Sequence, residues 1–136
     1  MVMINGTVLP SATNFIIDFQ CDDKTNQDVA FHFNPRFNKG NVVCNTKKNK
    51  IWGSEEHKSE VPFSLGQPFE IRTQVTNQNY KVSVDRSAFL EYNHRIPVEL
   101  VTYFRCIWRC YCENCGDTST RGCIPLKPFK TADSAV

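Results

Sequence analysis

The sequence lacks the features of secreted and membrane-spanning chains. No basic segment followed by an apolar run opens the chain, and no stretch approaches the roughly 18 apolar residues of a membrane-spanning helix. The formal net charge is only +2, which is too small to indicate a nucleic-acid surface. We therefore expect no membrane insertion, no nucleic-acid partner and a cytoplasmic location.

An even set of cysteines is also missing. The chain has seven, and five of them crowd into its last quarter, unlike the framework of a disulfide scaffold. Cys112 and Cys115 form one CxxC motif, but no second CxxC stands at zinc-ribbon spacing. We therefore expect no cofactor and no metal. Zinc is a minor alternative to oxidation, intermolecular disulfides or an unstructured tail, and Ser134–Val136 has the form of a PDZ ligand.

Long runs with helical periodicity are absent, and strand-like alternation takes their place. The odd positions are apolar in Phe15–Gln20 and in Val29–Asn34. Phe69–Val75 and Tyr80–Val84 flank the polar stretch Thr76–Asn79, which suits a hairpin loop. Short alternating runs between Pro and Gly residues predict an all-β fold, a two-sheet antiparallel sandwich in which each sheet turns one face inward.

The alternation fades near the C-terminal cysteines. A chain of 136 residues fits one compact domain. We assign residues 1–105 to that domain and residues 106–136 to an atypical Cys-rich tail, in which residues 117–136 are expected to be irregular.

Polar residues at alternate positions predict a row on one sheet face. His32, Asn34 and Arg36 would span roughly 13 Å on a strand, and Asn45 would extend the row on a neighbouring strand. The alternative for this row is an ordinary exposed surface. Trp52 lies between Lys-rich and Glu-rich segments, and its alternative is a core position.

These residue types together suit a sugar. Galactose has an apolar face that stacks on an aromatic ring, whereas its hydroxyls need donors and acceptors held in place. Trp52 supplies the ring, and the polar row with Glu55 supplies the donors and acceptors.

Three segments resemble the signature segments of galectins, in the family's order: His32–Asn38, Val42–Thr46 and Trp52–Glu56. Flanking stretches agree, so the resemblance covers about residues 2–105. It implies a jelly-roll-like sandwich that binds β-galactosides such as lactose and N-acetyllactosamine without altering them. The implied partners are galactoside-containing glycans and glycoproteins, met in the cytoplasm, the nucleus or outside the cell after non-classical export.

The resemblance also implies a role for each site residue. In galectin-like binding, the axial O4 of galactose is read by His32, Asn34 and Arg36, and O6 by Asn45 and Glu55. Trp52 stacks beneath the ring, and Glu55 also orients Arg36. The expected carbohydrate-binding residues are therefore His32, Asn34, Arg36, Asn45, Trp52, Glu55 and His57.

Two departures qualify the resemblance. His57 stands where the family pattern has an arginine, which puts one sugar contact in doubt. Compared with the family pattern, the chain is also expected to lack the usual first and last strands, with the Cys-rich segment in place of the last one. A protein-interaction module with an altered sugar site is the alternative function, and the oligomeric state is left open.

An enzyme is the remaining class, with Glu55, Glu56 and His32 as an acid/base set for glycoside cleavage. Adjacent carboxylates on a strand face opposite ways, so we expect no catalysis.

Overall fold

The computed structural model describes residues 1–21, 26–107, 110–112 and 121–125. Twelve strands and one short 3-10 helix occur in these ranges: β1 (Val2–Val8), β2 (Ile16–Cys21), β3 (Val29–Arg36), β4 (Asn41–Lys48), β5 (Ile51–Trp52), β6 (Glu56–Lys58), β7 (Pro68–Val75), β8 (Asn79–Val84), β9 (Ser87–Asn93), η1 (Val98–Leu100), β10 (Val101–Ile107), β11 (Cys110–Cys112) and β12 (Arg121–Pro125). No helix in the described part of the chain is long and apolar enough to cross a membrane.

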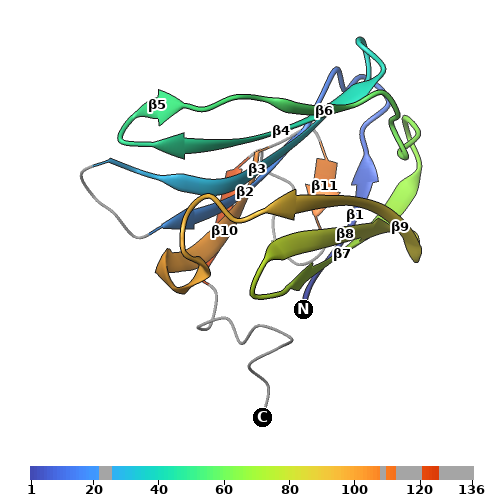
Figure 1. Ribbon diagram of the computed structural model, residues 1–136. Helices are drawn as coiled ribbons and strands as arrows, with labels where there is room; N and C mark the ends of the chain where they lie inside the picture. Colours follow the sequence, from blue (N-terminus) through green and yellow to red (C-terminus); the bar gives the residue numbers. More distant parts are fainter. Residues whose placement is uncertain (22–25, 108–109, 113–120, 126–136) are drawn as a thin grey trace.

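The strands form two antiparallel sheets that face each other (Figure 1). Within the described residues, one sheet has five strands in the order β11-β1-β7-β8-β9. The other has seven, in the order β12-β10-β2-β3-β4-β5, with β6 also pairing with β4. The expected two-sheet antiparallel sandwich is therefore confirmed, as is the hairpin between β7 and β8.

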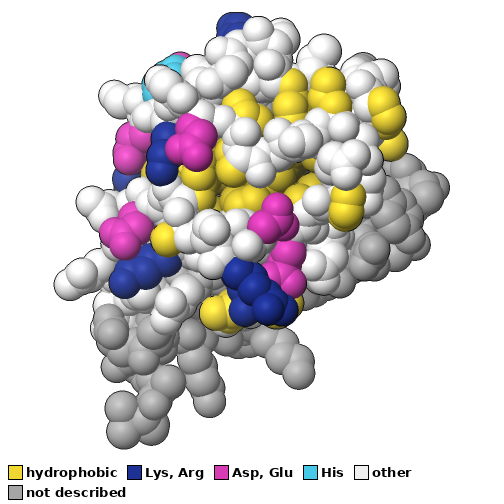
Figure 2. Space-filling view, turned by 90° about the vertical axis from the view of Figure 1, so that its right-hand side faces the viewer, with side chains coloured by type: hydrophobic (Ala, Val, Ile, Leu, Met, Phe, Trp, Pro, Cys, Tyr) yellow, Lys and Arg dark blue, Asp and Glu magenta, His cyan; other side chains and the backbone are white. Residues whose placement is uncertain are grey.

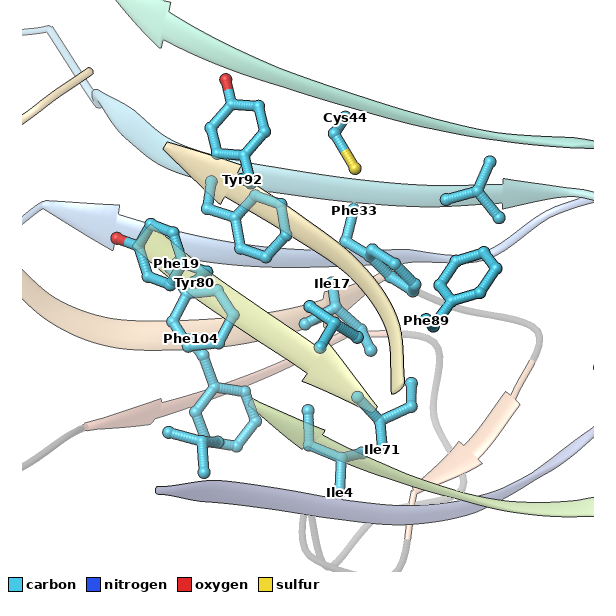
Figure 3. Packing of buried hydrophobic residues seen from close by; sticks show 14 of the residues in the cluster. Ile4, Ile17, Phe19, Phe33, Cys44, Ile71, Tyr80, Phe89, Tyr92 and Phe104 are labelled. Atoms are coloured by element: carbon cyan, nitrogen blue, oxygen red, sulfur yellow. The ribbon is translucent and has the colours of Figure 1, made fainter. Parts of the chain in front are cut away.

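The core lies between the sheets and is rich in aromatic rings. The Phe31 centroid on β3 lies 5.7 Å from that of Phe19, 4.7 Å from that of Tyr80 and 4.8 Å from that of Tyr92. Figure 3 shows Phe19, Tyr80 and Tyr92 converging from different strands. Because large aromatic side chains bury the most apolar area, this cluster ties the two sheets together.

Alternation along β3 and β4 separates core from surface. Phe31 and Phe33 belong to the buried cluster, whereas His32, between them, is only partly buried. On β4, Val42 and Cys44 point into the same cluster, as expected. The face that carries His32 is thus fixed by the aromatic residues on either side of it.

Two short strands lie in the Cys-rich tail, and one of them, β12, interrupts the segment 117–136 that was expected to be irregular. β11 pairs with β1, with Cys110 opposite Val8, and β12 pairs with β10, with Cys123 opposite Arg105. Each covers an edge whose backbone groups would otherwise lack strand partners. The other positions of 117–136, which include the PDZ-like terminus, lie outside the described residues, and the domain boundary at residue 105 stays a prediction.

One side of the sandwich is closed by side chains rather than by backbone. Lys58 on β6 donates to the Phe89 carbonyl of β9, and its Nζ lies 4.5 Å from the centroid of the Phe89 ring. The Lys58 stem therefore bridges the edge strands of the two sheets. Figure 2 shows one face of the molecule, on which hydrophobic side chains gather and charged side chains lie mainly to the left of and below them.

Candidate functional site

The edge strand beside β4 is broken, and the break shapes the site. β5 pairs with one end of β4 and β6 with the other, so residues 53–55 leave the ladder between them. Gly53 sits in a crowded position, since a Cβ there would lie 3.1 Å from Arg95 Nη1 and 3.4 Å from Asn45 Oδ1. The Gly53 amide still donates to the Thr46 carbonyl at 2.9 Å. The break thus places Trp52 and Glu55 at the two ends of one short loop.

The structure brings six of the seven expected site residues to one groove. His32 on β3 lies directly opposite Asn45 on β4, and Arg36 lies opposite Asn41. The groove has a volume of about 540 Å³, and its lining consists of Ile16, His32, Asn34, Arg36, Asn45, Trp52, Gly53 and Glu55. Ile16 and Gly53 were not among the expected site residues. The alternation of β3 and β4, together with the broken edge, therefore supplies the lining of the groove except for Ile16, which comes from β2.

A buried carboxylate holds the His32 ring. Asp18 Oδ1 lies 2.7 Å from His32 Nδ1, and the two side chains are 5% and 13% exposed. A carboxylate accepts hydrogen bonds, so it keeps the proton on Nδ1 and leaves Nε2 of the neutral ring as an acceptor. Sequence reasoning missed Asp18, although a charged residue within the apolar run of β2 was a signal that could have been followed.

The side chains of Asn34 and Arg36 are held by a series of hydrogen bonds and one ion pair. Asn34 Nδ2 donates to the Phe15 carbonyl at 2.7 Å and to Asn14 Oδ1 at 3.3 Å. Its Oδ1 accepts from Arg36 Nε at 2.8 Å, and Arg36 Nη2 lies 3.7 Å from Glu55 Oε2. Because Nε is bound to Asn34 and one Nη faces Glu55, the guanidinium is held by two neighbours before any ligand arrives.

Trp52 offers an exposed aromatic surface to the groove. Its residue is 45% exposed, which excludes the core position considered above. The ring lies edge-on to His32, with centroids 4.8 Å apart, and Lys47 Nζ is 5.9 Å from its centroid. An indole that is fixed on one side and open on the other is suited to stack on an apolar ligand face.

His57 does not line the groove but contacts a residue that does. Its Nε2 lies 3.2 Å from Glu55 Oε1, and its Nδ1 lies 3.3 Å from Asn41 Nδ2. Lys58, the next residue, points away to the Phe89 carbonyl, as expected of a neighbour on a strand. Glu55 therefore has two partners on the site face, Arg36 and His57.

Two buried groups close to the groove, Cys44 and Tyr92, have raised pKa values. Burial, with the nearby Glu56 charge, raises the pKa of the Cys44 thiol to about 12, and burial also raises the pKa of Tyr92. Glu56 binds Arg95 at 2.8 Å, so the adjacent carboxylates do have different partners. In the described ranges, no group of three His, Cys, Asp or Glu residues is placed to hold a metal ion. The cysteine side chains beyond residue 105 lie outside that description.

Comparisons with known proteins agree with this geometry. The galactoside-binding lectin family matches residues 1–107. Galectin-3 of Canis lupus familiaris is 48% identical over 99 residues, which are 71% of this chain and 32% of that protein. Galectin-6 of Mus musculus is 45% identical over 103 residues, or 75% of this chain and 34% of the relative. The chain thus spans about a third of the length of these curated relatives.

Solved structures show the same likeness. A substituted form of human galectin-16 superposes with a TM-score of 0.75 at 30% identity, covering 81% of this chain and 80% of the other. The galectin LEC-6 of Caenorhabditis elegans gives 0.71 at 20% identity, covering 90% of this chain and 81% of the other, and so shares the fold. Because the family matches most of the chain and its lectins are non-catalytic, the expectation of no enzyme is confirmed. The chain belongs to the galectin family of galactoside-binding lectins.

Proposed function

We propose that this chain binds β-galactosides of the lactose and N-acetyllactosamine type through the groove of β3, β4 and the 53–55 loop. One observation carries the proposal. Six residues of types suited to galactose line a single groove, and the polar ones among them are held by protein partners before a ligand arrives. Binding then costs little ordering of side chains, which favours affinity.

The proposed contacts follow from the donors and acceptors left over. His32 Nε2 is an acceptor, and Arg36 keeps N–H groups beyond those facing Asn34 and Glu55. An axial hydroxyl both donates and accepts, so it suits this pair. Asn45 keeps one Nδ2 proton for O6, because the other donates to the Gly53 carbonyl at 2.9 Å. Trp52 stacks on the apolar face of the ring.

The binding test uses purified, folded protein on lactose-agarose, followed by calorimetric titration with lactose. Retention and elution by free lactose are expected. Trp52→Leu is expected to abolish retention, because the stacking surface is lost. Ile51→Ala is the matched control, since Ile51 is the preceding residue, is 72% exposed and does not line the groove. Folded parent protein that ignores lactose in both assays contradicts the proposal.

His57 favours a second candidate, a protein-interaction module whose sugar site is altered. A family arginine at this position would place a bidentate cation beside Glu55, whereas His57 offers one ring nitrogen at 3.2 Å. Losing one charge-assisted bond corresponds to about 1–2 kcal/mol, or about tenfold in affinity.

The variant His57→Arg separates the two candidates. If the parent binds lactose and the variant binds about tenfold more tightly, the first candidate holds and His57 tunes it. If neither binds, the second candidate is favoured. Partners among cellular glycoproteins, and a cytoplasmic location with nuclear and non-classically exported pools, belong to the first candidate and are proposed with it.

A further inference from the structure

Arg95 lies outside the groove, yet it contacts three parts of the structure that shape it. Its Nη1 donates to Asn45 Oδ1 at 3.2 Å, and its Nη2 donates to Glu56 Oε2 at 2.8 Å. The guanidinium carbon also lies 5.0 Å from the centroid of the Tyr92 ring. Arg95 follows β9 of the five-stranded sheet, whereas Asn45 and Glu56 belong to the seven-stranded sheet. One side chain therefore joins the two sheets beside the groove.

The two hydrogen bonds fall on either side of the loop that carries the site. Asn45 supports the start of the loop, because its Nδ2 donates to the Gly53 carbonyl at 2.9 Å. Glu56 is the first residue after the loop. The Arg95 fork thus ties residues 53–55 at both ends, and a Cβ on Gly53 would come within 3.1 Å of its Nη1.

Arg95 also contributes to the orientation of the Asn45 amide, together with the Thr46 amide and the Gly53 carbonyl. Asn45 Oδ1 accepts from Arg95 and from the Thr46 amide at 2.8 Å, so its acceptor is fully engaged inside the protein. Only an Nδ2 proton is left for the groove. The amide is thereby presented as a donor rather than as an acceptor.

The backbone that carries Arg95 is itself fixed. The preceding His94 has Nε2 2.8 Å from the Thr76 carbonyl, its amide donates to the Gln78 carbonyl at 3.0 Å, and its ring centroid lies 4.6 Å from that of Tyr80. The following Ile96 is buried in the core. Arg95 is therefore presented from a rigid segment, as a residue that positions others must be.

We infer that Arg95 is a positioning residue of the galactoside groove, which clamps the 53–55 loop and fixes the Asn45 amide as a donor to the sugar. The inference rests on the proposed function for its ligand. A lysine cannot replace this arginine, because one ammonium cannot meet Asn45 and Glu56 with the geometry of a planar fork.

The test compares Arg95→Gln and Arg95→Lys with the parent by calorimetric titration with lactose. Both variants are expected to bind about tenfold more weakly, which is about 1.4 kcal/mol. Arg72→Gln is the matched control, because Arg72 forms a 2.7 Å ion pair with Glu70 on the other sheet, away from the groove. Parent-like affinity in Arg95→Lys overturns the inference, since the charge alone would then suffice.

A second measurement needs no sugar. Amide hydrogen exchange at Gly53, whose N–H bonds to Thr46 in the parent, is expected to speed up in Arg95→Gln and to stay unchanged in Arg72→Gln. Exchange that rises equally over all strands indicates general destabilisation and overturns the inference. If the parent ignores lactose but Gly53 alone loosens, the proposed function fails and the positioning role stands. If the parent binds lactose and neither readout changes, only the positioning role fails.

Discussion

Replacing Asp18 by asparagine tests whether a buried charge orients His32, the histidine that is proposed to contact the sugar. Asp18→Asn keeps the size of the side chain and one acceptor oxygen but removes the negative charge. In the parent, Oδ1 lies 2.7 Å from His32 Nδ1, and both side chains are largely shielded from water. The variant therefore changes the strength of one hydrogen bond and little else.

The magnitude follows from that single bond. A hydrogen bond to a charged group contributes about 1.5–3 kcal/mol and a neutral one about 0.5–1.5 kcal/mol. The difference of about 1–1.5 kcal/mol corresponds to about a tenfold loss of the ring state that offers a bare Nε2 to the ligand. We expect lactose affinity to fall by about this factor.

Calorimetric titration with lactose measures the affinity, and ¹⁵N NMR of the ligand-free protein reports the tautomer of His32. Asp28→Asn is the control, because Asp28 accepts a hydrogen bond from the Asn49 amide in an exposed position, with no contact to His32. An unchanged tautomer with unchanged affinity shows that Asp18 does not hold the ring. A changed tautomer with unchanged affinity shows that His32 does not read the sugar.

Three further predictions concern the core behind the groove. Tyr92→Phe removes a hydroxyl that lies 2.6 Å from Thr46 Oγ1, so the free energy of unfolding in urea should fall by about 1 kcal/mol, and no change would mean that the bond contributes nothing. Because burial and Glu56 hold the Cys44 pKa near 12, its thiolate is scarce at lower pH, and iodoacetamide at about pH 8 should modify it only after unfolding, as mass spectrometry can show. Phe31→Ala opens a cavity among three aromatic rings and should cost about 3–5 kcal/mol of stability in thermal or urea unfolding, whereas a smaller loss would show that the cluster collapses to fill the space.

Much of the groove was accessible from sequence, because alternation is a local property. A residue's face on a strand depends only on its neighbours, so the shared face of His32 and Asn34 and the inward positions of Val42 and Cys44 could be predicted. The pairing of strands within the all-β fold could not be predicted in this way, because it depends on the register between distant segments. Only the hairpin loop between β7 and β8 indicated from local sequence which two strands pair.

The partners of the site residues could not be predicted for that reason. Asp18 reaches His32 because β2 and β3 pair with those two residues opposite each other. Arg95 reaches Asn45 from the connection after β9, across the gap between sheets. The separation of the two residues in the sequence does not predict either contact. The short strand Arg121–Pro125 escaped prediction because it lacks clear apolar alternation and is paired by the open edge of β10.

The alternation of β3 has a consequence for how such a protein can diverge. Phe31 and Phe33 hold the two sheets together, whereas His32 and Asn34, on the same strand, face the groove. Alternate residues of one strand therefore determine the fold and the lining of the groove. Substitutions at the groove positions can change what is bound while the neighbouring positions keep the sandwich intact. The ligand preference of such a protein can therefore change through successive single substitutions at groove positions, and each intermediate sequence still folds.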